Sequence, residues 1–266
     1  MLSTIGIHFA GIQYKIEGVD LEEETGQFLD GFMGFSDSGV IYTVKINRDA
    51  SWQIKDSEFQ TLPEWNKNTL KIGLSFCDVE IDFIRRNVFV LTGGYIGLFG
   101  LLRFLSAMHL IRNNGFLLHA SSLVTVSGAY VFSGVSESGK TTIARMAEEN
   151  MRVLTDETTA IFKNQSVYEA YATPFAGELG NLGVNSGSKL RALFFIKKDN
   201  YFWHRRLGKQ EAVAELFRNT IFTALDQKIT ETVFNTFLSF SNEVSCYELG
   251  FSRSKDLWRY IDGITG

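Results

Sequence analysis

Residues 134–142 (GVSESGKTT) are the part of this 266-residue chain best suited to chemistry. They match the pattern Gly-x-x-x-x-Gly-Lys-Thr at every fixed position. Glycines let a backbone wrap closely around phosphate oxygens, the ammonium of Lys140 can reach the β and γ phosphates, and the hydroxyl of Thr141 can bind Mg²⁺. The sequence therefore predicts a nucleotide site. We assign to it Gly134, Ser136, Ser138, Gly139, Lys140, Thr141 and Thr142.

The flanking residues agree with this interpretation. Residues 129–133 are mostly apolar and predict a short strand that leads into the loop, and residues 140–150 predict a helix with Ile143, Met146 and Ala147 on one face. A glycine turn with a purely structural role would not need Lys140 and Thr141 together. We therefore expect a phosphate-binding loop between a strand and a helix.

Two adjacent acids, Asp156 and Glu157, follow the apolar residues Val153 and Leu154. Their separation from Lys140 is enough for one helix and one return strand. We therefore expect them beside the loop, where a metal and an attacking hydroxyl need carboxylates. Neighbouring residues of a strand point to opposite faces, so we expect Asp156 nearer to the metal and the acceptor, with Glu157 reaching in through water. Two solvated turn residues are the alternative interpretation.

Three segments taken together resemble HPr kinase/phosphorylases: His119-Ala120 within LLHASSL, the loop GVSESGKTT, and Asp156-Glu157. ATP-dependent phosphoenolpyruvate carboxykinases are similar only around the loop. The resemblance covers roughly residues 115–200. It implies ATP and Mg²⁺ as cofactors, His119, Asp156 and Glu157 as catalytic residues, and Thr141, Asp156 and Glu157 as metal ligands. His119 would then lie near the γ-phosphate or the acceptor; without the resemblance it would be interpreted as a core histidine bonded to the backbone.

The sequence also departs from this family. Glu157 stands where the second Asp of the pair is usual, and Glu137 replaces the second glycine of the loop, which places a carboxylate near the phosphates. The bifunctional enzymes carry an Arg-Gly-Leu-Gly signature, whereas the nearest segment here, residues 174–183 (PFAGELGNLG), has Glu178 in place of an arginine. We therefore do not expect efficient phosphorolysis. Glu178 is interpreted either as a ligand of a metal or acceptor or as an exposed loop acid.

The function expected from these residues is a kinase that transfers the γ-phosphate of ATP to a hydroxyl, with serine of a peptide or small protein as the leading acceptor. A small-molecule hydroxyl is an alternative acceptor. A protein of another class also fits: a nucleotide-gated peptide-binding module with little or no phosphotransfer, in which the Phe-rich C-terminal helices form a partner surface.

Composition limits the classes of partner and the cellular location that we expect. The net charge of −4 and the absence of basic clusters argue against nucleic acid. The start of the chain lacks a signal-peptide pattern, and the apolar residues 88–105 are interrupted by Arg103 and glycines, so we expect a cytoplasmic protein without a membrane span. Cys77 and Cys246 predict two reduced thiols. Homo-oligomerisation is left open.

Hydrophobic periodicity predicts an α+β or α/β fold: a strand-rich region in residues 1–95, a connecting helix in residues 96–114, and an HPr-kinase-like P-loop domain with C-terminal helices in residues 115–266. Apolar residues at spacings of three and four predict helices at residues 95–113, 213–225, 229–240 and 254–261, besides that at 140–150. Short β-branched or aromatic runs predict strands at residues 5–9, 13–16, 40–46, 70–76, 79–83, 87–91, 117–126, 129–133, 152–155, 159–162, 167–171, 190–197 and 244–251.

Overall fold

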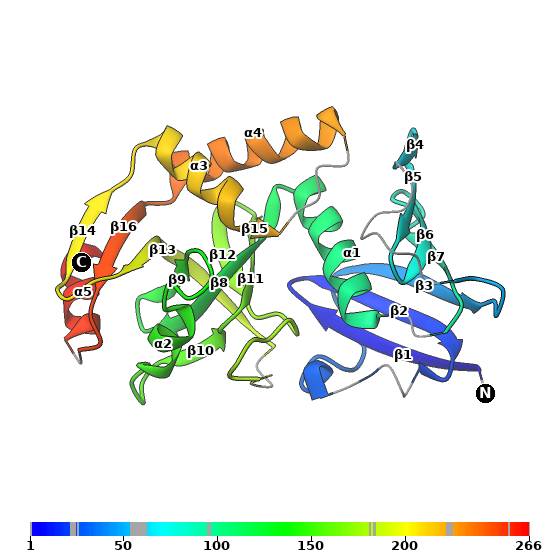
Figure 1. Cartoon of the computed structure of the whole chain (residues 1–266), viewed down its shortest axis with the longest axis horizontal. Coiled ribbons are helices and arrows are strands. Elements are labelled where there is room, and N and C mark those ends of the chain that lie inside the picture. Colours follow the sequence, from blue (N-terminus) through cyan, green and yellow to red (C-terminus); the bar gives the residue numbers. More distant parts are fainter. Residues whose placement is uncertain are drawn as a thin grey trace. The chain divides into compact units, whose positions relative to one another are not determined.

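The chain folds as a mixed α+β protein, as the sequence predicts, and its N-terminal part is rich in strands (Figure 1). The structure, a computed structural model, describes residues 2–21, 25, 27–53, 63–94, 97–180, 182, 185–221, 226–254 and 256–265. Two compact units, Met1–Leu105 and Ser106–Gly266, divide the chain within helix α1 (Leu98–Arg112). No helix in the described part of the chain is long and apolar enough to span a membrane.

The first unit contains a seven-stranded sheet with the order β1-β2-β3-β7-β6-β5-β4. Alternating residues of its strands are buried, which explains why their period-two pattern is visible in the sequence. Strand β4 was not predicted, because three residues with one aromatic side chain carry too little pattern. The strands are β1 (Leu2–Phe9), β2 (Ile12–Val19), β3 (Val40–Arg48), β4 (Glu64–Asn66), β5 (Thr69–Leu74), β6 (Cys77–Asp82) and β7 (Asn87–Thr92).

The second unit contains a nine-stranded sheet in which β9 pairs with both β8 and β13. Two of its strands, β14 and β15, were not predicted, because one is polar and the other has two residues. The strands are β8 (Gly115–Thr125), β9 (Gly128–Ser133), β10 (Arg152–Thr155), β11 (Thr158–Asn164), β12 (Val167–Tyr171), β13 (Gly187–Lys198), β14 (Trp203–Arg206), β15 (Thr220–Ile221) and β16 (Cys246–Phe251).

Strands β9, β13 and β16 are parallel to one another, with Leu193 of β13 opposite Val131 on one side and Cys246 on the other. Parallel neighbours bring their carboxyl ends to the same edge of a sheet. The residues that follow β9 and β16 and the end of β13 therefore come together, although they are far apart in the sequence.

Helices cover both faces of this sheet. On one face, Ile143 of α2 (Lys140–Arg145) and Trp258 of α5 (Leu257–Thr265) belong to one core with Phe132 and Phe194. On the other face, the ring of Phe116 in β8 meets Phe237 and Phe240 of α4 (Gln227–Glu243) edge to face. Helix α3 (Lys209–Asn219) packs against α4 and β8.

Helix α2 is shorter than predicted, because it ends at Arg145 rather than near residue 150. The carbonyl of Met146, which a longer helix would use internally, accepts a hydrogen bond of 2.6 Å from Nε1 of Trp258. Glu148, Glu149 and Asn150 are exposed and would add no buried surface to a further turn. A tertiary contact therefore decides where this helix ends.

The helix predicted at residues 213–225 also ends early, at Asn219. Thr220 and Ile221 instead form β15, which pairs with Leu118 and Leu117 of β8. The predicted residues Ala224 and Leu225 lie outside the described part of the chain. The side chain of Asn219 donates to the carbonyl of Glu215 at 2.8 Å, at the point where the helix gives way to the strand.

The two cysteines, Cys77 and Cys246, are buried and do not form a disulfide with each other. Burial raises the pKa of each thiol to about 12, so both are protonated at neutral pH. Protonated, buried thiols are poor nucleophiles, which gives these residues packing roles.

Candidate functional site

The glycine-rich loop, residues 134–140, connects β9 directly to α2. Gly139 has a φ of 109°, in the region that favours glycine, and a Cβ at this position would lie 2.5 Å from Cζ of Phe251. A Cβ on Gly134 would lie 2.8 Å from Oγ of Ser138. Both glycines are therefore required by the close packing of the loop.

Lys140 is buried at the centre of this loop, with 6% of its surface exposed. Its Nζ donates to the carbonyl oxygens of Gly134 at 2.9 Å and Val135 at 3.0 Å. Burial lowers the pKa of this ammonium, and the charge of Glu157 opposes that shift. A lysine charge is thus held against the loop backbone, facing a carboxylate.

Two serines of the loop differ in their surroundings. Ser136 is exposed, whereas the hydroxyl of Ser138 is buried and has no hydrogen-bond partner within the described residues. A buried hydroxyl without a partner costs free energy. The loop therefore retains one polar group that a ligand or a water molecule could satisfy.

The acid pair departs from the expected geometry. Asp156 is fully buried, and its two carboxylate oxygens accept hydrogen bonds from the backbone N–H groups of Gly177 at 2.9 Å and Leu179 at 3.0 Å. Its side chain thus anchors the segment that carries Glu178. Glu157, rather than Asp156, lines the cavity beside the glycine-rich loop.

The opposite orientations of neighbouring residues explain this result. The pairing of β10 with β8 shifts between Val153 and Thr155, and Asp156 follows that irregularity. The N–H of Glu157 donates to Oγ1 of Thr155 at 3.3 Å, and its carbonyl accepts from the N–H of Ala120 at 2.9 Å. Glu157 is thereby fixed on the cavity side, and Asp156 is fixed on the buried side.

His119, in β8, also lies at the cavity. Its Nδ1 is 3.3 Å from Oε1 of Glu157, and about a third of its side chain is exposed (32%). The structure therefore places His119 at the surface of the cavity rather than inside the core. The fold brings His119, Glu157 and Lys140 together at one cavity, although they belong to three separate segments of the sequence.

The loop cavity has a volume of about 470 Å³. Of the seven residues that the sequence assigns to a nucleotide site, Ser136, Gly139, Lys140, Thr141 and Thr142 line it, whereas Gly134 and Ser138 do not. Three basic residues among its walls were not predicted. The lining residues are His119, Ser136, Glu137, Gly139, Lys140, Thr141, Thr142, Arg145, Glu157, Glu178, Lys198 and Arg253.

The missed basic residues come from elements next to the loop. Arg145 ends α2 and pairs with Glu178 at 3.1 Å. Lys198 ends β13, and its Cε lies 3.7 Å from the position that a Cβ of Gly139 would occupy. Arg253 follows β16. A weak sequence signal existed: parallel strands that end near a phosphate loop are places to search for cations.

Some of the basic side chains that line the loop cavity are not paired with a carboxylate of the described residues. In the described part of the chain, Arg145 has the carboxylate of Glu178, whereas Lys198 and Arg253 have no carboxylate partner. Cations gathered around a backbone loop attract anions. The cavity is therefore suited to a phosphate-bearing ligand.

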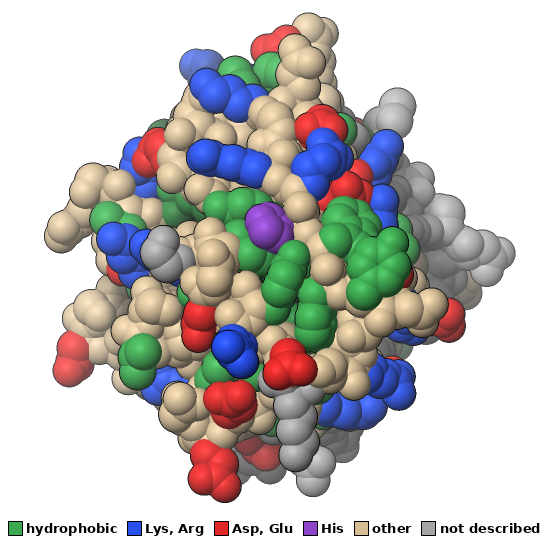
Figure 2. All heavy atoms as spheres, turned by 90° about the vertical axis from the view of Figure 1, so that its left-hand side faces the viewer, with side chains coloured by type: hydrophobic (Ala, Val, Ile, Leu, Met, Phe, Trp, Pro, Cys, Tyr) green, Lys and Arg blue, Asp and Glu red, His purple; other side chains and the backbone are tan. Residues whose placement is uncertain are grey.

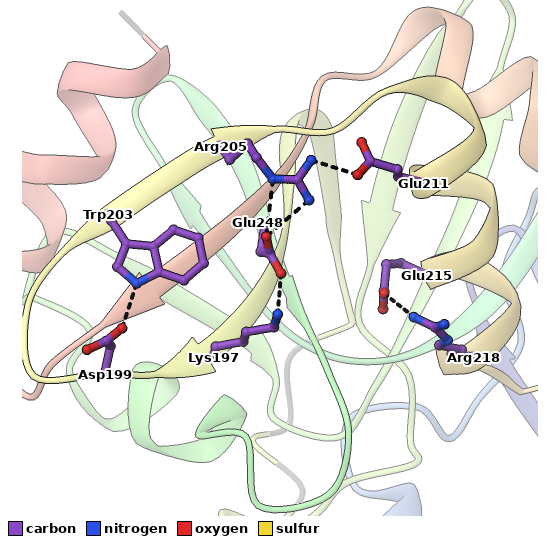
Figure 3. Close-up of polar contacts among 8 residues, drawn as sticks. All are labelled: Lys197, Asp199, Trp203, Arg205, Glu211, Glu215, Arg218 and Glu248. Atoms are coloured by element: carbon purple, nitrogen blue, oxygen red, sulfur yellow. Dashed lines mark hydrogen bonds and ion pairs between the residues drawn. The ribbon is translucent and has the colours of Figure 1, made fainter.

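A second cavity, the ion-pair cavity, borders Gly134 and Val135 and has a volume of about 330 Å³. Figure 3 shows the ion pairs that line it: Glu248 lies between Lys197 and Arg205, Arg205 also reaches Glu211, and Arg218 contacts Glu215. Each basic side chain named here has a carboxylate partner. This cavity offers no unpaired charge to an anion.

A further cavity opens on the side of the unit that carries β14 and α5, where Figure 2 shows hydrophobic side chains gathered around a histidine. The rings of Phe202 and Tyr260 stack at 5.2 Å, and the hydroxyl of Tyr260 lies 2.8 Å from Nδ1 of His204. This aromatic surface contains none of the loop residues.

The fold and site define a mixed α+β protein with a lysine-containing glycine-rich loop between a central strand and a helix. The sequence model of the family described as SynChlorMet cassette protein ScmC matches residues 101–265. Since this match spans more than half of the chain, the protein belongs to the ScmC family. A comparison with curated proteins finds no match.

Proposed function

We propose that this protein is an ATP- and Mg²⁺-dependent kinase that transfers the γ-phosphate to a hydroxyl group, with serine of a peptide or small protein as the acceptor. The observation that carries the proposal is the meeting of the buried Lys140 with the His119–Glu157 pair in the loop cavity. Phosphoryl transfer depends on positioning and charge neutralisation, and this cavity supplies groups for both.

The residues present fit a nucleotide. The close backbone wrap at Gly134 and Gly139 leaves no room for a Cβ, and Ser136, Thr141 and Thr142 line the loop cavity with hydroxyl groups that can bind phosphate oxygens. Lys140 would exchange the two carbonyl oxygens that it now contacts for phosphate oxygens. ATP would supply the transferable phosphoryl group.

The donor set also fits Mg²⁺. This ion is commonly held by one or two protein groups together with substrate phosphates and water. Thr141, which lines the loop cavity, would supply a hydroxyl, and Glu157, which lines it too, would contact the ion only through a water molecule, so that its carboxylate stays free to accept a proton. Within the described residues, no cluster of three or more His, Cys, Asp or Glu side chains could hold a metal by itself. Binding of the metal would thus depend on the nucleotide.

The geometry supports Glu157 as the general base in place of Asp156. The carboxylate of Glu157 would accept the proton of the acceptor hydroxyl while the hydroxyl oxygen bonds to the γ-phosphorus and the bond to the leaving oxygen of ADP breaks. His119, at 3.3 Å, would orient this carboxylate and stabilise its charge. Asp156 would act as a positioning residue, because it holds the segment containing Glu178.

The reverse reaction with inorganic phosphate has less support. Residues 174–183 contain no arginine, and Glu178 pairs with Arg145 at 3.1 Å. Asn181 and Gly183 of this segment lie outside the described residues. A carboxylate at this position repels phosphate, so we expect phosphorylation without efficient phosphorolysis.

A second candidate function is a nucleotide-gated peptide-binding module with little phosphotransfer. The observation that favours it is Glu137, which lines the loop cavity with a carboxylate and has a φ of 63°. A negative charge beside the phosphates would weaken charge neutralisation in the transition state. Such a protein would bind ATP and transfer no phosphate.

The test is incubation with γ-labelled ATP and Mg²⁺ in the presence of serine-containing peptides, a protein extract or small-molecule alcohols. We expect label to move to a hydroxyl acceptor, and the receiving fraction distinguishes peptide from small molecule. Lys140→Ala is the control. ATP binding without transfer above the level of Lys140→Ala would reject the kinase and favour the binding module.

A further inference from the structure

A fourth cavity, here called the helix-end cavity, continues from the loop cavity and has a volume of about 320 Å³. Three of its lining residues, Thr142, Arg145 and Arg253, also line the loop cavity. Met146 and Ser254 complete it. The two cavities therefore form one continuous surface, with Arg253 at the junction.

The order of residues gives this surface a direction. His119 and Glu157 line the loop cavity and are not part of the helix-end cavity. From Lys140, which a terminal phosphate would contact, the path along α2 passes Thr142 and reaches Met146 just beyond the helix. The helix-end cavity thus lies at the end of the surface remote from the proposed reacting groups.

The chemistry of this remote end suits a flat ring. Arg145 is engaged by Glu178 at 3.1 Å, whereas Arg253 has no ion-pair partner in the part of the chain that the structure describes. A guanidinium is planar and stacks on aromatic faces, and a thioether makes favourable contacts with ring edges. Arg253 and Met146 therefore offer the two contacts that a base needs.

A tertiary hydrogen bond holds Met146, and local hydrogen bonds of Ser254 order the backbone next to Arg253. The carbonyl of Met146 accepts from Nε1 of Trp258 at 2.6 Å. After Arg253, the N–H of Ser254 donates to the carbonyl of Ser252 at 2.9 Å, and the hydroxyl of Ser254 lies 3.1 Å from Oδ2 of Asp256. The cavity is thus built from two segments that are far apart in the sequence, the end of α2 and residues 253–254 beyond β16.

We propose that the helix-end cavity is the nucleoside subsite and that it takes a purine, whose ring stacks on the guanidinium of Arg253 and contacts Met146. This inference rests on the proposed function, since it assumes that phosphates occupy the loop cavity. It adds the site of the base, which the proposed function leaves open, and the residues that contact its ring.

The test compares the binding of ATP and of inorganic tripolyphosphate by calorimetry. Arg253→Lys keeps the positive charge and removes the planar stacking group. We expect it to weaken ATP binding by about 3- to 30-fold, the range of cation–π contacts, with tripolyphosphate binding unchanged. Lys140→Ala should weaken both ligands. Arg259→Lys, on α5 and outside both cavities, is the matched control and should change neither.

The outcomes separate the two proposals. Wild-type protein that binds neither ATP nor tripolyphosphate would overturn the proposed function and the subsite with it. Wild-type protein that binds both, combined with an Arg253→Lys variant that binds both equally well or loses both equally, would overturn the subsite alone. A comparison of ATP with UTP gives a further test. Arg253→Lys should weaken the binding of ATP more than that of UTP, because the larger purine ring has more surface to stack on the guanidinium.

Discussion

Two cavities border the glycine-rich loop and differ in how their charges are paired. In the ion-pair cavity, Lys197, Arg205 and Arg218 each contact a glutamate (Figure 3). In the loop cavity, Lys198 and Arg253 have no such partner within the described residues. Both cavities contain acidic and basic residues in similar proportion. Pairing, rather than the number of charges, therefore distinguishes a surface that can attract an anion from one that is already neutralised.

Glu248 neutralises two of the basic side chains that line the ion-pair cavity. Its side chain is only 17% exposed and lies between Lys197 and Arg205. The hydrogen bonds from Lys197 and then from Arg205 hold the pKa of this carboxyl below its ordinary value. Removing one partner would leave a partly buried charge uncompensated, which is costly. The arrangement therefore favours a structural role for this cavity.

The largest expected effect contrasts one lysine from each cavity. Lys140→Ala should weaken ATP binding by about a hundredfold, because it removes charged hydrogen bonds to phosphate. Lys197→Ala should change ATP binding by less than about twofold, since Lys197 does not line the loop cavity and its charge is already paired with Glu248. Calorimetric titration measures both constants, and circular dichroism verifies folding. Equal losses in the two variants would contradict the assignment of the loop cavity.

The next effect concerns the two carboxylates that could act on a hydroxyl. Glu157→Gln should lower the rate of phosphotransfer by about a hundredfold, the scale of general acid–base catalysis, while ATP binding remains. Glu215→Gln, in the ion-pair cavity, should leave the rate within about twofold. Rates are measured with γ-labelled ATP at saturating Mg²⁺. An unchanged rate for Glu157→Gln would exclude Glu157 as the general base and would return that role to Asp156.

The third prediction is that substitution of Asp156 lowers the stability of the protein. Asp156→Asn replaces an oxygen that accepts from a backbone N–H with an amide donor, so we expect a loss of roughly 1.5–3 kcal/mol in the free energy of unfolding. Asp262→Asn, on the exposed side of α5, should cost less than about 0.5 kcal/mol. Urea unfolding followed by circular dichroism gives both values. Full stability together with lost phosphotransfer would show that Asp156 acts in the chemistry.

The smallest effect is expected at Glu137, whose φ of 63° is unfavourable for a residue with a Cβ. Glu137→Gly should raise the free energy of unfolding by up to about 1 kcal/mol and should tighten ATP binding, because a carboxylate leaves the loop cavity. Glu149→Gly, at a position without a left-handed φ, should not stabilise the protein. Destabilisation by Glu137→Gly would show that the carboxylate makes a necessary contact.

Much of the fold could be predicted because its strands carry local patterns. Residues 152–155 and 167–171 were predicted with the observed bounds, since buried positions alternate or run together there. Strand β14 has the sequence WHRR, which shows no alternation of apolar and polar residues, and its strand partner β16 lies far along the chain, so nothing local indicates it. The end of α2 depends on Trp258, which no helical periodicity near Met146 can reveal.

The part of the candidate site that belongs to a sequence motif could be predicted, whereas the residues that strand order and pairing register bring to it could not. Residues 134–142 identify the loop by spacing alone. Lys198 and Arg253 reach it because β13 and β16 run parallel to β9, which requires knowledge of strand order. The different orientations of Asp156 and Glu157 follow from a register shift in β10, and two adjacent acids in a sequence do not show which of them is buried.

The glycine-rich loop is supported by residues that come much later in the sequence. Phe251 packs against Gly139, and the bond from Trp258 to Met146 joins residues 112 positions apart. During synthesis on a ribosome, the loop therefore emerges long before its supports. A nascent chain that ends before β16 would contain the whole glycine-rich loop but would lack Phe251 and Trp258, which pack against the loop and the end of α2. The surface around the loop would then be complete only after β16 and α5 have both left the ribosome.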